Sequence, residues 1–293
     1  MIVNSMAALH GMLADLTATT RMLLIAGLPG VGKSLVLQQA ALLAEQCGRP
    51  TYLLRWDMAR LAFEASTEAR AFPPKDGMTH AAIRLAAGLW VRKAVGRWHA
   101  HAPGLLIGEC PLVGNRFSEL AKRVNDQLEP VLASKSVHFL VPVPGVEVRA
   151  RIEAARMSEL ESPAHESEAN SAPLTVIREL TDEIHALAKR LGVATLSGTG
   201  DYQPEVYLGV YSRLLRHRHH SPLRVETALQ VVRSAQFLPN SCVDLVPSAA
   251  EASDALRIIA KLEPEQVQAQ ASAWWQIDGE RPHFWHNSAS LQP

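Results

Sequence analysis

The residues that most directly indicate chemistry are eight consecutive ones, Gly27-Leu28-Pro29-Gly30-Val31-Gly32-Lys33-Ser34. Glycines at this spacing let successive backbone N–H groups turn toward one anion, and Lys33 adds a mobile positive charge. The Ser34 hydroxyl stands where it can hold Mg²⁺ beside phosphate oxygens. The pattern predicts a phosphate loop for a nucleoside triphosphate, ATP with Mg²⁺. Its contacting residues are expected to be Gly27, Pro29, Gly30, Val31, Gly32, Lys33, Ser34 and Leu35.

The elements that must position this loop are recognisable on both sides of it. Residues 22–26 form an apolar run of the length of a buried strand, and residues 35–47 have the pattern of a helix that Gly48 closes. Strand, loop and helix in this order are the context that a phosphate loop requires.

Composition limits the class of protein. With 293 residues, 47% apolar and 20% charged, the chain can build an ample core. Its apolar runs are of strand length, and it begins with no signal-peptide pattern, so we expect no membrane contact. Three widely spaced cysteines, Cys47, Cys110 and Cys242, suit reduced thiols and a cytoplasmic location. Zero formal net charge argues against a broad nucleic-acid-coating surface, although a local basic groove remains open.

Further apolar runs alternate with helical periodicity along the chain. Strands are expected at 51–54, 105–107, 137–141 and 193–196, which with 22–26 predicts an α/β fold with a mainly parallel, five-stranded sheet covered on both faces. Ligands of such sheets gather at the carboxyl ends of the strands. The polar segment 161–173 predicts a loop, and a possible strand at 243–246 and a helix at 249–262 follow.

Two strand ends carry acidic candidates. Asp57 follows the second strand, where it can deprotonate an attacking hydroxyl, and Arg60 stands one helical turn further on. The alternative is a helix-capping Asp with a surface Arg. Glu109 ends the third strand, where it can hold Mg²⁺. The alternative there is a buried Glu bound by backbone N–H groups. Cys110 stands where ATPase motors commonly carry a second acid.

Two arginines after the fourth strand share one side of an expected helix. Arg149 and Arg156 can point together at phosphates, whereas Arg151 points elsewhere. The alternative is a solvated face with a pair such as Arg149–Glu153. Joined to the soft segment, the helix predicts a closing lid over 145–173. Tyr202, in the turn-rich stretch after the expected fifth strand, is a candidate for contact with the adenine, or part of a plain connecting loop.

Four features together resemble the P-loop kinase family over roughly residues 20–215: the phosphate loop, the Asp57–Arg60 pair, the strand that carries Glu109 and the arginines of the expected lid. The group includes nucleotide, shikimate, adenylylsulfate and polynucleotide kinases. The resemblance implies a three-layer P-loop NTPase fold with strand order 2-3-1-4-5. It also implies an acceptor-activating role for Asp57 and a phosphate-contacting role for Arg60.

The resemblance implies a kinase-like domain at 1–220 and a small C-terminal appendage at 221–293 of unknown role. Within the domain, the helical segment 61–103 is expected to choose the acceptor. The leading function is phosphoryl transfer from ATP to a hydroxyl of a small molecule, nucleoside or nucleic-acid end. The expected catalytic residues are Lys33, Asp57, Arg60, Arg149 and Arg156, and the metal ligands are Ser34 and Glu109. The alternative is an ATPase or a nucleotide-sensing module with a protein partner. The run 216–220, with its histidines, leaves contact with a metal or RNA open.

Overall fold

A single sheet organises the molecule. The computed structural model describes residues 7–75, 77–161, 174–193, 201–227 and 238–278. The sheet has the order β5-β4-β1-β3-β2-β6, and every neighbouring pair is parallel. The strands are β1 (Met22–Ala26), β2 (Thr51–Arg55), β3 (Leu105–Cys110), β4 (Val137–Pro144), β5 (His220–Val225) and β6 (Val243–Asp244).

The expected order of the first four strands, 2-3-1-4, is confirmed, and the strand count is corrected from five to six. The strand expected at 193–196 lies, from residue 194 on, outside the described residues. The place beside β4 is taken by β5, which begins at the boundary expected between domain and appendage. Pro222 obscured this strand in the sequence, because proline is rare within strands. It is tolerated in β5, an edge strand, where its missing N–H costs no ladder bond.

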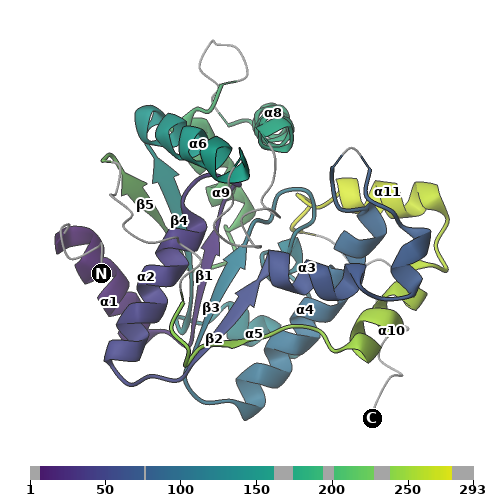
Figure 1. Cartoon of the computed structure of the whole chain (residues 1–293), viewed down its shortest axis with the longest axis horizontal. Helices are drawn as coiled ribbons and strands as arrows, with labels where there is room; N and C mark the ends of the chain where they lie inside the picture. Colours follow the sequence, from purple (N-terminus) through teal and green to yellow (C-terminus); the bar gives the residue numbers. More distant parts are fainter. Residues whose placement is uncertain (1–6, 76, 162–173, 194–200, 228–237, 279–293) are drawn as a thin grey trace.

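Helices cover both faces of the sheet (Figure 1). On one face Leu23 and Ile25 of β1 share a cluster with residues of α1 (Ala7–Thr19) and α2 (Lys33–Gln46). On the other face Met22 and Leu24 join residues of α3 (Trp56–Glu64), α4 (Ala81–His101), α8 (Leu174–Arg190) and α9 (Pro204–Leu214). This alternation along one strand is what a buried strand between two helical layers requires.

The remaining helices extend the second layer. The helices α10 (Ala249–Ile259) and α11 (Pro264–Ser272) pack against α4, so the part of the chain expected to be an appendage shares the core (Figure 1). The helix α6 (Val146–Glu161) follows β4 at the carboxyl end of the sheet, and α5 (Glu129–Leu132) precedes β4. Short 3₁₀ turns cover Glu68–Ala71 and Ser118–Leu120. Trp90 and Trp98 on α4 are buried in the core.

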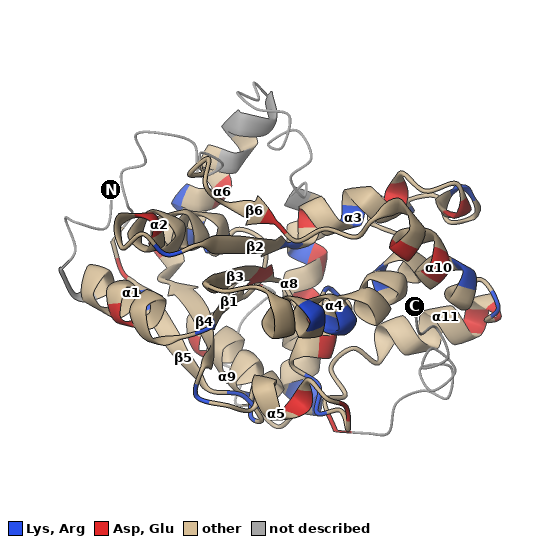
Figure 2. Ribbon diagram, turned by 90° about the horizontal axis from the view of Figure 1, so that it is seen from below, with Lys and Arg blue, Asp and Glu red and all other residues tan. Residues whose placement is uncertain are grey.

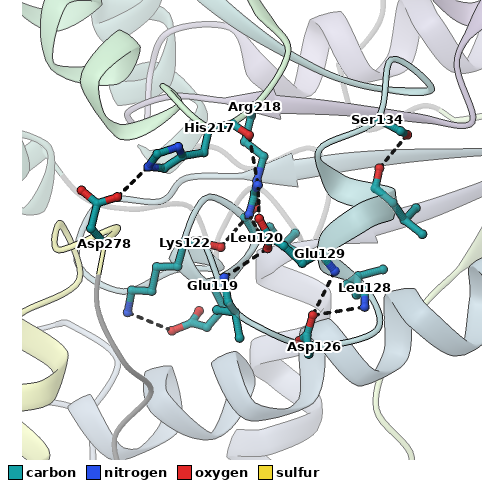
Figure 3. Close-up of polar contacts among 12 residues, drawn as sticks. Glu119, Leu120, Lys122, Asp126, Leu128, Glu129, Ser134, His217, Arg218 and Asp278 are labelled. Carbon is teal, nitrogen blue, oxygen red and sulfur yellow. Dashed lines mark hydrogen bonds and ion pairs between the residues drawn. The ribbon is translucent and has the colours of Figure 1, made fainter.

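A buried polar network joins α4, α5 and the start of β5. Arg218 donates to both carboxylate oxygens of Glu129, at 2.8 and 3.0 Å, as Figure 3 shows. Arg92 pairs with Asp126 at 2.7 Å and with Glu129 at 3.2 Å. The run 216–220 thus has a structural role through Arg218, and no cluster of metal-ligating side chains occurs in the described ranges. Fully buried guanidinium groups are stable here because carboxylates compensate them.

Basic and acidic residues are interspersed over the described helices (Figure 2), in keeping with zero net charge. Within the described part of the chain, no helix combines the length and apolarity needed to cross a bilayer. Cys47, Cys110 and Cys242 carry free thiols.

Candidate functional site

The predicted phosphate loop turns between β1 and α2, as its sequence requires. Gly32 caps α2 with φ of 86°, a left-handed conformation that favours glycine. At Gly27 a Cβ atom would lie 2.4 Å from the Tyr207 hydroxyl, so α9 packs too close to the loop for any side chain. Lys33 is the first residue of α2, and its Nζ donates to the Leu28 carbonyl at 2.9 Å across the loop. Because the first N–H groups of a helix have no partner within the helix, those at the start of α2 can bind an anion at the loop.

Glu109 lies directly beside this loop. The Ser34 hydroxyl is 3.3 and 3.2 Å from its two carboxylate oxygens, and Lys33 Nζ is 3.7 Å from Oε1. The contact follows from register, because Glu109 of β3 pairs with Ile25 of β1, which leads into the loop. A hydroxyl and a carboxylate at this spacing form a donor set that suits Mg²⁺, which takes few protein oxygens and completes its shell with phosphate and water.

Arg149 contacts the loop from the opposite side. Its Nη1 donates to the Pro29 carbonyl at 2.8 Å, and Nε donates to Glu153 at 2.6 Å. The pair with Glu153 considered from the sequence therefore forms, but on a buried arginine, 2% exposed, and not on a solvated face. Nη2 is buried with no hydrogen-bond partner among the described residues. A buried guanidinium with a spare donor against a phosphate loop is suited to bind phosphate.

The other lid residues divide into exposed and undescribed ones. Arg151 is exposed. Arg156 lies on α6, but its side chain is outside the described part, as are residues 162–173 of the expected lid.

Tyr202 lies beside Arg149. The guanidinium carbon of Arg149 is 5.1 Å from the centre of the Tyr202 ring, a cation–π contact. The ring also lies 5.5 Å from that of Tyr207, which packs on Tyr211 at 4.7 Å. Burial raises the pKa of Tyr202, and its buried hydroxyl has no partner among the described residues. The sequence did not identify Tyr207 and Tyr211, whose helical spacing resembles that of ordinary core residues.

Asp57 and Arg60 follow β2, two strands from the phosphate loop. Asp57 is in the first turn of α3, whose N-cap is Arg55, so the capping interpretation of Asp57 is wrong. Its carboxylate is 64% exposed and lies 3.7 Å from Arg60 Nε, while Arg60 also pairs with Glu64 at 3.0 Å. Arg55 pairs with Glu109 in the sheet, at about one strand spacing, roughly 5 Å, and Asp57 follows Arg55 by two residues, at the start of α3.

Two further arginines, which are not among the expected site residues, flank Gly114 in the loop after β3. Arg84 comes from α4, and Arg116 from the loop after β3. Burial and the charge of Arg84 lower the pKa of Arg116 to about 10, with smaller effects of Glu183, Asp57 and Arg60. The signal available in the sequence was Gly114-Asn115-Arg116, a turn just beyond the strand that carries Glu109.

A pocket elsewhere has a structural explanation. About 510 Å³ in volume, it lies at the amino ends of the strands, between Arg21, Arg49 and Gly104. Arg21 and Arg49 donate to backbone carbonyls there, including that of Gly104. These hydrogen bonds connect the segments that precede the strands, at the end of the sheet opposite the phosphate loop.

In comparisons with known proteins, no protein-family model matches the chain and no curated protein sequence matches it significantly.

Proposed function

We propose that the protein is an ATP- and Mg²⁺-dependent phosphotransferase that moves the γ-phosphoryl group to a hydroxyl of an acceptor. The observation that carries the proposal is the grouping of Lys33, Ser34 and Glu109 at the phosphate loop, with Asp57 at the end of the second strand over. Such a grouping supplies phosphate binding and an acceptor base side by side. The parallel sheet with helices on both faces is compatible with a P-loop kinase-like fold.

The chemistry assigns one role to each group. The Asp57 carboxylate accepts the proton of the acceptor hydroxyl as its oxygen bonds to the γ-phosphorus, and the bond from that phosphorus to the β–γ bridging oxygen breaks, releasing ADP. Lys33 and Arg149 balance charge on the phosphoryl oxygens. Ser34 and Glu109 would hold Mg²⁺, which would supply charge neutralisation at the phosphates.

Cys110 favours transfer over simple hydrolysis. It occupies the position where a water-activating acid would stand, and it is fully buried. Burial raises the pKa of its thiol, so the neutral group cannot serve as a base at neutral pH. The acceptor base is instead at Asp57, an exposed position that an acceptor can reach.

Radiolabelled ATP tests the proposal. The protein with Mg²⁺ and ATP labelled at the γ-phosphate is incubated with pooled metabolites, nucleosides and oligonucleotides, and products are separated to find labelled acceptors. We expect label on a hydroxyl compound, lost in Lys33→Ala and kept in Lys189→Ala, a change at an exposed position of α8. Label found only as inorganic phosphate, at a rate no pool alters, would contradict the proposal and favour an ATPase.

A further inference from the structure

The loop after β3 brings two guanidinium groups together without an acidic partner. A Cβ atom added to Gly114 would lie 2.6 Å from Nη1 of Arg116 and 3.2 Å from Nη1 of Arg84, so both groups flank this glycine. Arg116 is 7% exposed. Each donates to a loop carbonyl, Arg84 to Gly114 at 2.5 Å and Arg116 to Val113 at 3.1 Å. Neither forms an ion pair within the described part of the chain.

This arrangement differs from the other buried arginines of the protein. Arg92 and Arg218 are each compensated by carboxylates, as burial of a charge normally demands. Arg84 keeps a buried Nε without a partner among the described residues. The charge of Glu183 of α8 acts on Arg84 without forming an ion pair with it, and Glu183 accepts a hydrogen bond from Trp274. A half-buried and a buried guanidinium group side by side, with Arg84 Nε left without a partner among the described residues, form a site for an anion.

The backbone of this loop also departs from ordinary conformations. Leu112, Asn115 and Phe117 have φ values of 63°, 62° and 62°, although none of them is glycine. All three are buried, and the Asn115 amide nitrogen has no partner in the described ranges. Strain of this kind persists where the surrounding structure holds a loop for a function.

The position of the arginine pair links it to the acceptor and not to the nucleotide. Trp56, next to Asp57, packs on Phe117, next to Arg116, with ring centres 5.3 Å apart, so Arg116 lies on the Asp57 side of the site, whereas Lys33 and Arg149 already serve the phosphate loop. Arg60 is compensated by Asp57 and Glu64, and the charge of Glu183 acts on both Arg84 and Arg116, so the pair keeps a net positive charge. A phosphate monoester, which carries about −1.5 to −2 at neutral pH, is an anion that this charge attracts.

We propose that Arg84 and Arg116 bind a phosphate monoester on the acceptor, so that the substrate class is phosphorylated alcohols. The assignment of this phosphate to an acceptor rests on the proposed function, whereas the anion site itself does not depend on it. With the phosphate held by this pair, a hydroxyl of the same molecule faces Asp57.

Inorganic phosphate is a suitable probe, provided that the phosphate loop is already filled. Calorimetric titration with phosphate is done on protein saturated with Mg²⁺ and a non-hydrolysable ATP analogue. We expect one phosphate site, weakened at least about tenfold in Arg84→Gln and in Arg116→Gln, each of which removes one guanidinium. Arg213→Gln, an exposed change near the end of α9, serves as the control and should bind as the wild type does.

Each outcome decides between the two proposals. Phosphate binding abolished by the ATP analogue, or unchanged in both arginine variants, would overturn the acceptor-phosphate site and leave phosphoryl transfer standing. A phosphate site lost in these variants, combined with no transfer to any phosphorylated alcohol, would keep the anion site and contradict the kinase. Acetate that binds equally well through the same arginines would replace phosphate by a carboxylate. If circular dichroism shows that a Gln variant is unfolded, the Lys variant at that position takes its place, with the same loss expected because Lys cannot donate two parallel bonds.

Discussion

Lys33 shows how one residue serves both the loop and its ligand. In the structure it is 5% exposed, bonded to the Leu28 carbonyl and 3.7 Å from Glu109. These contacts hold the ammonium group over the loop, near the place where phosphates are expected.

We predict that Lys33→Ala and Ser34→Ala abolish phosphoryl transfer while the fold remains, because both side chains lie in the first turn of α2 and contact the loop and Glu109, not the apolar core. Transfer of labelled phosphate and far-UV circular dichroism of each variant measure the two effects. Activity that persists in either folded variant would contradict the role given to the loop.

Asp57 is the residue on which the choice of chemistry depends. We predict that Asp57→Asn binds an ATP analogue as the wild type does but transfers phosphate about 10²- to 10⁴-fold more slowly, since only the proton acceptor is removed. Calorimetry gives the affinity, and single-turnover kinetics give the rate. Glu205→Gln, an exposed carboxylate on α9, is the matched control. A parallel loss of ATP affinity would instead make Asp57 a metal ligand or a structural group.

At the scale of elements, the start of α6 positions a cation at the phosphate loop. Arg149 forms hydrogen bonds with Pro29 and Glu153, whereas Arg151, two residues further along α6, is exposed. We predict that Arg149→Ala lowers turnover about 10²- to 10³-fold, the cost of losing one preorganised donor, and that Arg151→Ala stays close to wild type. Steady-state kinetics of the two variants make the comparison. Equal effects would remove α6 from the catalytic site.

The contacts between α5 and β5 predict a dependence of stability on pH. Partial burial alone would raise the pKa of Glu129, but its hydrogen bonds with Arg218 and Val124 and the charges of Arg218 and Arg92 lower it overall. A lowered folded pKa means that this stabilisation is fully present above the unfolded value of about 4.3 and is lost as pH falls through the folded value.

We therefore predict that Glu129→Gln is destabilised by about 3–5 kcal/mol at neutral pH, because Arg218 and Arg92 lose a buried charge partner. Urea unfolding at neutral pH and well below about pH 4.3 should show a smaller difference between variant and wild type in acid. Glu265→Gln on the exposed face of α11 is the control. A difference that does not shrink in acid would contradict the lowered pKa.

At the scale of the whole molecule, the segment after β5 belongs to the same folded unit. Trp274 is 1% exposed in the cluster that includes α4 and α8, and it donates a hydrogen bond to Glu183. Arg55 and Asp244 fix β6 to β2 by a two-bond ion pair at 2.9 and 2.7 Å. The core is thus continuous from β1 to the residues after α11.

We predict that Trp274→Ala destabilises the entire chain by about 3–5 kcal/mol in one cooperative transition, because a large core side chain leaves a cavity. Trp275→Ala, at a half-buried neighbouring position, should cost less. Thermal unfolding followed by circular dichroism and calorimetry tests this. A separate early transition in Trp274→Ala, with the rest unchanged, would mean an independent C-terminal unit.

The sequence by itself determined the parts of the site whose chemistry is local. The phosphate loop, the acid near the end of β3 and the strands around β1 follow from residue type, spacing and apolar runs, which act over a few neighbours. The order of these strands was implied by the resemblance to P-loop kinases. The tertiary structure decided what depends on distant segments. It paired Arg84 with Arg116, buried Arg149 against Pro29, and placed residues 220–225 beside β4, where the sequence indicated no strand. An arginine that contacts solvent and one that is buried beside another cation have the same local pattern. Only packing, which removes water and brings separate elements together, distinguishes them.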